Sequence, residues 1–419
     1  MRTFASACAW ILIAVATAGC RSISTPPASG TGTVGAGDGG QPGSDGGAQP
    51  DAGAGAQPDA GAGGEGGDEC AGLGPDTVGP PSAAVTIRAS ASENWFAGAN
   101  EGSGTLALMM TNDNYEPSLR VRLFDPSGAQ RGTYQPAQVT LSEQIFGQLD
   151  GFTVSYYDTV HDSHELVALD RNASVIAATG TSSRVVWPVA DPLAGIVVLG
   201  RVNDTSPIGV AAYDERLNQR FRTQLSSIER VLASGVDLEG NTLVLLDAKD
   251  RYGAGKLGGI WIDHSGNAGA EFLALENIPS PPYVFLTPRV GSGFFVGTNP
   301  GPPTAAAWIG QFDAMGGRTA PPEWLAARPV ETLRLARKRR AYAVISPARL
   351  DNACHVDVEV VAPSGKSCGT ATFPAAQSGQ FCSSGLFVGY DGTAVVGSVE
   401  DTGGGFRTFT FRWWTAFLR

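Results

Sequence analysis

From residue 83 onwards the chain alternates between short apolar runs and clusters of turn-forming residues. The runs include SLRVRLFD, ELVALD, GIVVLG and TLVLLD, and Gly, Pro, Asn and Asp separate them. Twelve-residue windows with the apolar spacing of an amphipathic helix are hard to find. Short apolar or alternating runs bounded by turn residues are typical of β-strands. The pattern therefore predicts an all-β domain.

These runs recur as a repeat. In each unit an apolar residue precedes a position that begins a turn, and successive positions are 44 to 50 residues apart. The positions are Asp125, Asp170, Asp214, Asp263, Asp313, Ala362 and Arg412. A unit of this length has room for four strands, which is the content of a propeller blade. An Asp at a strand end can accept N–H groups two residues on, so we interpret the aspartates as turn formers.

The strand count predicts how a ring of such units closes. The seventh unit has three strand-like runs, LFVGYDG, TAVVGSVE and RTFTFRWW, and no fourth run before Arg419. The run AAVTIRAS stands before the first unit and has no partner there. A strand that fills the vacancy in the last blade removes an open sheet edge. We therefore expect a seven-bladed β-propeller over residues 83–419, closed by an N-terminal strand.

Residues 20–82 have a different composition. This segment is rich in Gly, Ala, Pro and Asp, contains AQPDAGAG twice in succession, and holds eight acidic residues against Arg21. Such a segment cannot bury enough apolar area to offset the entropy lost on ordering. We expect a disordered tether with an r.m.s. reach of roughly 40 Å. The domain that follows is only mildly acidic, so nucleic acid is not an expected partner.

An export signal precedes the tether. Arg2 is followed by an apolar run, Phe4–Ala18, that is too short to span a bilayer, so residues 1–19 fit an export signal peptide. The sequence TAGC, which ends at Cys20, resembles a bacterial lipobox. It predicts that Cys20 is lipidated and anchors the chain to the outer membrane or the cell surface. The sequence ATA just before Gly19 also fits a cleavage site that would release a soluble secreted protein.

Taken together, these features resemble the bacterial β-propeller families, and the whole chain resembles their lipid-anchored members. The resemblance rests on the repeat period and on the lipobox-like TAGC, and no motif identifies a subfamily. It implies a propeller that a lipid holds at the bacterial envelope.

Four cysteines remain when Cys20 and the signal peptide are set aside, and an even number suits disulfides in an oxidising compartment. The expected strands place Cys354 and Cys382 on one face of the ring and Cys70 and Cys368 on the other. A disulfide needs Cα atoms within about 7 Å of each other. The pairs Cys354–Cys382 and Cys70–Cys368 are therefore favoured.

The loops between the second and third strands of the expected blades concentrate acidic residues on one face. The candidate binding residues there are Asp113, Asp158, Asp162, Asp204, Asp247, Asp250, Asp351 and Asp401. Propellers usually bind ligands on this face, at the mouth of the central channel. The competing interpretation is that polar residues simply occupy solvent-exposed loops.

One of these loops, in the sequence YDTVHDSHE, holds a possible metal site. His161, Asp162 and His164 are residue types that bind divalent metals. The same residues also suit a solvated connection between two strands, because no third histidine lies at a useful spacing. No other cofactor is predicted, although Ca²⁺ could bind the acidic face.

Two functional hypotheses follow. The sequence lacks G-x-S-x-G, H-E-x-x-H and P-loop motifs, which favours a non-catalytic binding or scaffold protein whose ligand is an envelope protein or polysaccharide. The alternative is a Ca²⁺-assisted hydrolase or lyase that acts on small sugars or lactones at the channel mouth. Such an enzyme needs only a few carboxylates and amides.

The lipid anchor can be tested at its attachment residue. Replacing Cys20 by Ser should move the protein from the detergent phase to the aqueous phase, because the lipid then has no thiol to join. Detergent phase partitioning followed by immunoblotting measures this, and Cys8→Ser within the signal peptide is the matched control. A wild-type chain that already partitions into water would contradict the anchor.

Overall fold

The computed structural model describes the repeat region and the few residues before it. The described residues are 68–73, 78–100, 104–112, 119–137, 140–181, 185–192, 195–203, 205–227, 230–278, 284–298, 307–314, 316–328, 332–336, 340–346, 348–350, 353–378, 381–383, 386–389, 392–415 and 417–418. The predicted signal peptide, Cys20 and the predicted tether as far as residue 67 lie outside them. Neither helix in the described part of the chain is long and apolar enough to cross a membrane.

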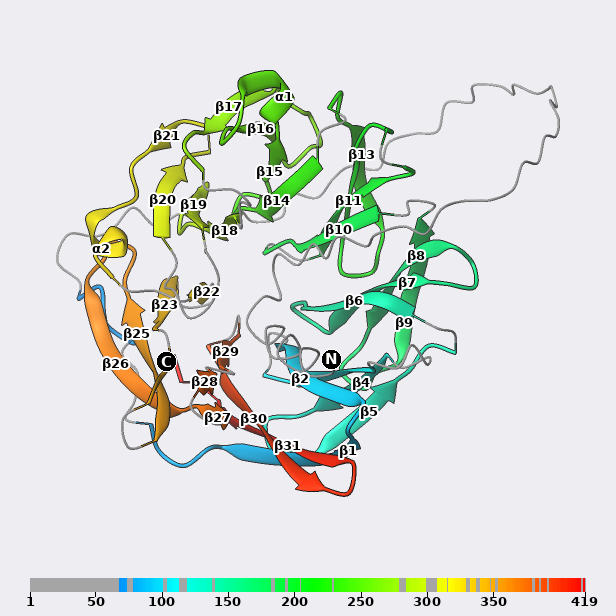
Figure 1. The fold of residues 1–419 in the computed structure, drawn as a ribbon, viewed down its shortest axis with the longest axis vertical. Helices are drawn as coiled ribbons and strands as arrows, with labels where there is room; N and C mark the ends of the chain where they lie inside the picture. Colours follow the sequence, from blue (N-terminus) through cyan, green and yellow to red (C-terminus); the bar gives the residue numbers. More distant parts are fainter. Residues whose placement is uncertain are drawn as a thin grey trace, which may run out of the picture. The chain divides into compact units, whose positions relative to one another are not determined.

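Seven antiparallel sheets stand side by side in a ring (Figure 1). The fold is a seven-bladed β-propeller, as the repeat period predicts. In each blade we call the strands a, b, c and d, from the centre of the ring outwards. The a–b and c–d turns therefore lie on one face of the ring, the turn face, and the b–c connections lie on the opposite face, the b–c face.

The strand bounds are as follows. Blade 1 contains β2 (Glu93–Asn100), β3 (Leu106–Asn112), β4 (Arg120–Phe124) and β5 (Gln130–Tyr134). Blade 2 contains β6 (Thr140–Gly147), β7 (Phe152–Asp158), β8 (Ser163–Leu169) and β9 (Val175–Thr181). Blade 3 contains β10 (Val185–Ala190), β11 (Ile196–Arg201), β12 (Gly209–Tyr213) and β13 (Gln219–Gln224).

Blade 4 contains β14 (Arg230–Val236), β15 (Thr242–Asp247), β16 (Leu257–Ile262) and β17 (Phe272–Leu275), with α1 (Lys249–Tyr252) in its b–c connection. Blade 5 contains β18 (Val284–Pro288), β19 (Phe294–Thr298), β20 (Ala307–Phe312) and β21 (Arg318–Thr319), and α2 (Glu323–Ala326) follows it.

Blade 6 contains β22 (Thr332–Ala336), β23 (Ala341–Ile345), β25 (Cys354–Val361) and β26 (Ser367–Pro374), and the short β24 (Arg349–Leu350) pairs with the start of β25. A two-stranded hairpin, β27 (Ala376–Ser378) and β28 (Phe381–Ser383), leads to blade 7. Blade 7 contains β29 (Leu386–Val388), β30 (Ala394–Gly403), β31 (Phe406–Trp414) and β1 (Ala83–Ser90).

The inner strands are apolar on both sides because each blade is packed between two neighbours. Every residue of β11 and of β19 is buried, whereas in the outer strand β13 only Phe221 is buried. Strands that are covered on both faces read as continuous apolar runs. The core therefore lies in layers between blades, as where Met109 and Val121 of blade 1 pack with Val154 and Val167 of blade 2.

The repeated aspartates form the c–d turns, as predicted. Asp125 Oδ1 accepts the N–H groups of Ser127 at 2.9 Å and Ala129 at 3.1 Å. Turns of the same kind are made by Asp170, Asp214, Asp263 and Asp313. The hydrogen bond from the Ser127 hydroxyl is the main cause that lowers the pKa of Asp125, so this carboxylate stays ionised in its turn.

The seventh position of the repeat needs a correction. Arg412 lies inside β31, and Thr415 is the residue that follows the end of this strand. No c–d turn follows β31, because strand d of blade 7 comes from the other end of the chain. The Thr415 N–H donates to the hydroxyl of Ser82, just before β1, at 3.0 Å.

The N-terminal strand closes the ring as predicted. β1 pairs antiparallel with β31, from Ala83 opposite Trp413 to Ser90 opposite Phe406. Figure 1 shows β1 beside β31 at the lower edge of the ring. The outer edge of β31 is therefore covered by β1, so blade 7 is a complete four-stranded sheet.

Residues 69–73 and 78–82 belong to the same compact unit as the ring, although the sequence predicts the folded domain from residue 83. Cys70 forms the predicted disulfide with Cys368 at the start of β26, with 5.1 Å between the Cα atoms. Leu73 is buried in the cluster that contains Trp414, and the indole N–H of Trp414 donates to the Gly79 carbonyl at 2.9 Å. The residues just before β1 therefore belong to the folded domain.

Cys354, the first residue of β25, is also disulfide-bonded. The side chain of Cys382 in β28 lies outside the described residues. The pairing of Cys354 with Cys382 therefore stays a prediction.

Three truncations separate the roles of these segments. Deleting residues 21–67 should leave the melting temperature nearly unchanged, because it removes no described contact with the ring. Deleting residues 21–79 should lower the free energy of unfolding by about 2–5 kcal/mol, the usual cost of losing a native disulfide. Deleting residues 21–90 removes β1 and should prevent folding. Circular dichroism melts measure all three, and equal stability of the three proteins would contradict the closure.

Candidate functional site

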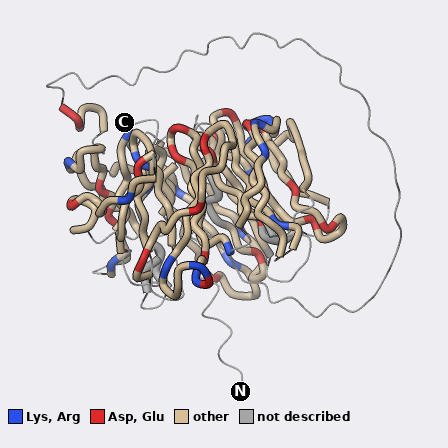
Figure 2. Tube along the Cα trace, turned by 90° about the horizontal axis from the view of Figure 1, so that it is seen from above, with Lys and Arg blue, Asp and Glu red and all other residues tan. Residues whose placement is uncertain are grey.

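Charged residues do not divide the ring into an acidic and a basic face. Figure 2 shows the ring edge-on, with acidic and basic residues on both rims. Among the candidate acidic residues, Asp113, Asp204 and Asp351 lie outside the described residues. The structure describes the other five and places them at the b–c ends of blades 2, 4 and 7. Asp158, Asp247 and Asp401 lie at or near the ends of β7, β15 and β30, and Asp162 and Asp250 lie in the connections.

The described acidic residues have separate local surroundings. Asp401 is near the tip of the β30–β31 hairpin, where it accepts the Nε–H group of Arg407 at 3.2 Å. Asp250 lies in the first turn of α1. In the described part of the chain, no three His, Cys, Asp or Glu side chains are placed so that they could share a metal ion. These carboxylates are therefore not brought together at one described site.

Asp158 organises the b–c connection of blade 2. Its side chain is 1% exposed, and Oδ1 accepts the N–H groups of Val160 at 2.8 Å and His161 at 3.1 Å. Oδ2 lies 2.7 Å from Nδ1 of His161, and this hydrogen bond is the main cause that raises the pKa of His161. Asp158 is therefore a turn-forming residue that also holds an exposed histidine ring.

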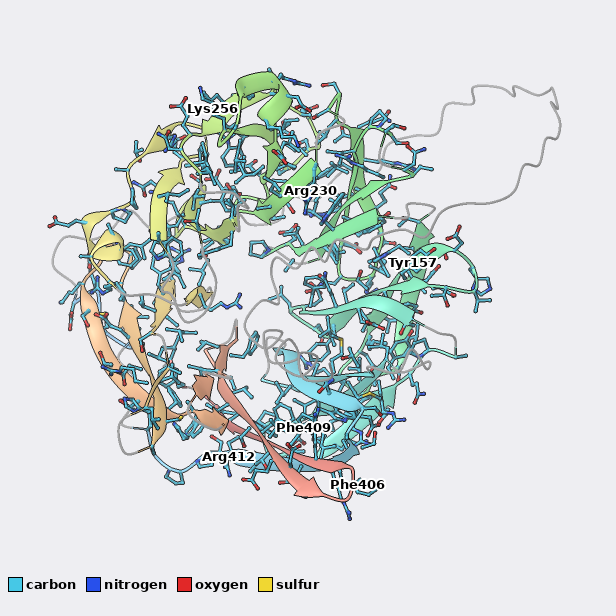
Figure 3. The ribbon with its side chains drawn as sticks, in the orientation of Figure 1. Tyr157, Arg230, Lys256, Phe406, Phe409 and Arg412 are labelled. Atoms are coloured by element: carbon cyan, nitrogen blue, oxygen red, sulfur yellow. A yellow bond between two sulfur atoms is a disulfide. The ribbon has the colours of Figure 1, made fainter. Side chains whose placement is uncertain are left out.

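His164 faces a different partner. It is buried on β8, and its Nε2 lies 2.6 Å from the hydroxyl of Ser155 on β7. Burial lowers the pKa of His164 to about 4, so this ring is neutral at neutral pH. Asp162 accepts the hydroxyl of Tyr157, which is labelled on the right of the ring in Figure 3. The proposed metal ligands His161, Asp162 and His164 thus each contact a different residue and do not converge.

A groove of about 480 Å³ lies between blades 1 and 2, on the side of blade 2 that faces blade 1. Its polar residues are Tyr134, Tyr156, Asp158, His161 and Glu165. Its apolar residues are Pro136, Ala137, Val167, Val175 and Ala178. Asp158 and His161 lie at the b–c end of the groove, and Val175, which follows the c–d turn, lies at its other end. The groove therefore extends from one face of the ring to the other, along the outer flank.

Two tyrosine hydroxyls meet in the groove. Tyr134 at the end of β5 and Tyr156 on β7 have their hydroxyl oxygens 3.2 Å apart. Burial is the main cause that raises the pKa of both residues, and the negative charge of Glu165 raises them further. Both hydroxyls therefore remain protonated and can donate or accept hydrogen bonds to a ligand.

Glu165 lies over a glycine of the neighbouring outer strand. It pairs with Gly180 of β9 in the sheet register, and its Oε1 accepts the hydroxyl of Ser163 at 2.6 Å. A Cβ atom on Gly180 would lie 2.7 Å from this oxygen. The glycine therefore leaves the space that the carboxylate occupies beside the groove.

The sequence indicated the loop of blade 2 but not the groove. Asp158 and His161 were expected on the b–c face, and both line the groove. Tyr134 and Tyr156 were missed, because they belong to different blades. The available signal was an aromatic residue near the end of a strand in each of two successive units, and such residues are common in strands.

Comparisons with known proteins identify no family. No family model matches the sequence, and no curated protein matches it. The chain is similar to the β-propeller domain of the Trilobed protease from Pyrococcus furiosus, at 10% identity and a TM-score of 0.48, over 77% of this chain and 98% of that chain. It is also similar to virginiamycin B lyase from Staphylococcus aureus, at 8% identity and a TM-score of 0.38, over 78% of this chain and 99% of that chain.

A third similar structure is puromycin hydrolase, at 13% identity and a TM-score of 0.44, over 78% of this chain and 54% of that chain. At these identities and scores the likeness carries no argument about activity. The assignment of the fold rests on the seven sheets of the present structure.

The two histidines of blade 2 should titrate on opposite sides of the ordinary pKa of 6.5. His164 is depressed to about 4, so the unfolded state binds its proton first as the pH falls. Stability that is present above pH 6.5 should be lost between pH 6.5 and 4, by about 3 kcal/mol. His161 should titrate above 6.5, because Asp158 favours its charged form.

NMR titration of the ring protons and melting curves at pH 7 and pH 4 measure these effects. His164→Gln should reduce the pH dependence of stability. An His164 pKa near 6.5 would contradict its burial against Ser155.

Proposed function

We propose that the chain is a non-catalytic binding propeller of the bacterial envelope, tethered by a lipid on Cys20, and that its ligand is an envelope protein or a polysaccharide. The observation that carries this proposal is the point at which the tether meets the ring. Cys70 is joined to Cys368, and the Ser364 hydroxyl donates to the carboxylate of Glu69. Ser364 lies in the c–d turn of blade 6, so the tether joins the ring at the turn face.

This attachment point supports an orientation. A membrane anchor at Cys20 is closer along the chain to the turn face of blade 6 than to the b–c face, so a short tether would keep the turn face nearer the lipid on average. The b–c connections lie at the opposite ends of the strands and would face away from the membrane. They include the polar end of the groove, with Asp158 and His161.

The disulfide also suits a tether. A pull on the chain before Glu69 passes through the bond between Cys70 and Cys368 into β26 before it reaches β1. The closing strand is thereby protected from being peeled away from β31. Disulfides form and persist in oxidising compartments, which supports export of this chain.

The contacts of the described carboxylates on the b–c face favour a role in binding or in turn structure, and not a role in metal-assisted catalysis. Asp158 is used by its own turn, and Asp401 by Arg407. The groove between blades 1 and 2 offers protonated hydroxyls, a carboxylate and an apolar wall. These are groups suited to binding a ligand in a defined orientation.

Fluorescence quenching on lipid vesicles tests the tether and the orientation together. A fluorescent amino acid replaces Lys366, in the c–d turn of blade 6, or Glu400, near the tip of the β30–β31 hairpin. The lipidated chain is bound to vesicles that carry a quencher lipid. Quenching should be stronger at position 366, and deletion of residues 28–63 should enlarge the difference because it shortens the tether.

The Cys20→Ser chain is the control, and it should show no quenching at either position. If the full-length chain does not remain bound to the vesicles, the proposed lipid anchor is wrong. Equal quenching at both positions in the shortened chain would overturn the orientation.

A further inference from the structure

The outer strand of blade 2, β9, differs from the outer strands of its neighbours. Its seven residues, VIAATGT, include no charged residue and no proline. The outer strands of blades 1 and 3 contain arginines, and those of blades 4 and 5 have only four and two residues. Sheet edges are normally protected by charge, proline, short length or a covering segment. β9 has no charged residue and no proline, and it is not short.

The two other long outer strands are protected. β26 is cross-linked to the segment around Cys70. β1 carries Arg88, whose guanidinium lies over the ring of Phe406 at 4.4 Å. β9 is the last strand of its sheet, and its Val175 and Ile176 are 53% and 49% exposed. An apolar, uncharged edge of this length is a template for another strand.

The groove lies alongside this edge. Val175 and Ala178 of β9 form part of its wall, together with Val167 of β8. Side chains of an added strand alternate between the two sides of the sheet, so every second one would point towards the groove. Main-chain hydrogen bonds to a sheet edge supply affinity, and pockets for alternate side chains supply specificity.

The charge of the groove selects the side chain that it would take. Glu165 and Asp158 are the carboxylates that line it, and His161 lies beside Asp158. The Asp158 carboxylate is already engaged by His161, whereas Glu165 is paired with a neutral hydroxyl, that of Ser163. The protonated hydroxyls of Tyr134 and Tyr156 lie on the same wall. A basic side chain with an apolar stem fits this combination.

We propose that β9 and the adjoining groove form a strand-addition site for an extended peptide segment of an envelope protein, with a Lys or Arg side chain of that segment directed at Glu165. This inference deepens the proposed function by naming the class of ligand. The occupant adds a fifth strand to blade 2, and its apolar residues cover Val175 and Ala178. The basic stem lies along Val167, and its charged end reaches Glu165.

Selection from a library of random ten-residue peptides on the immobilised full-length chain tests this. The enriched peptides should contain β-branched residues in alternation and at least one Lys or Arg. Binding of one enriched peptide is then measured by fluorescence anisotropy. Ala178→Lys should weaken binding at least tenfold. It places a positive charge in the groove, which repels the basic residue of the peptide, and its side chain is longer than that of Ala.

Ala178→Glu is the matched variant, of similar size and opposite charge, and it should bind the peptide at least tenfold more tightly than Ala178→Lys does. Gln224→Lys on β13 adds the same charge to another outer strand and should leave binding unchanged. Methylation of the peptide backbone nitrogens should abolish binding only at alternate residues. This period of two is the signature of strand addition and not of a side chain that simply enters a pocket.

Several outcomes would overturn the proposal. These are a selection that yields no binder, binders without a basic residue, binding unaffected by Ala178→Lys, and methylation effects without a period of two. Self-association of the chain that Ala178→Lys disrupts would make a second copy the occupant and would equally overturn it. None of these outcomes bears on the vesicle experiment, so the tether and the peptide site can fail separately.

Discussion

The pairing of β1 with β31 is the interaction on which the ring depends. Eight residues of β1 lie opposite eight residues of β31, so strands from the two ends of the domain share one sheet. The same strand supplies side chains to the interface between blades. Ile87 packs in one cluster with Phe411 of blade 7 and with Trp95 and Leu106 of blade 1. Because each blade needs a neighbour on both sides, an incomplete seventh blade would expose apolar surface on blade 1 as well.

The segment before β1 extends this closure to blade 6. Leu73 and Gly79 contact the region of Trp414, and Cys70 is bonded to β26. The chain is thus secured to blades 6 and 7 before it forms the closing strand.

The radial arrangement of blades explains where the groove lies. Neighbouring blades are closely packed near the centre and diverge outwards, so their outer strands are the most exposed. Between blades 1 and 2 this divergence leaves the groove beside β9. Gly180 contributes by leaving room for the carboxylate of Glu165.

The number of blades, the closing strand, the aspartate turns and the pairing of Cys70 with Cys368 could all be predicted from the repeat. These features depend on local periodicity and on the alternation of strand direction, which fixes the face of each connection. The groove and the surroundings of the histidines could not be predicted, because they depend on how separate strands and blades pack. Consecutive strand residues point to opposite sides of a sheet, so His164 and Glu165 are neighbours in sequence but face different blades. Tyr134 and Tyr156 meet only because two separate sheets are packed side by side, and no local pattern records that contact.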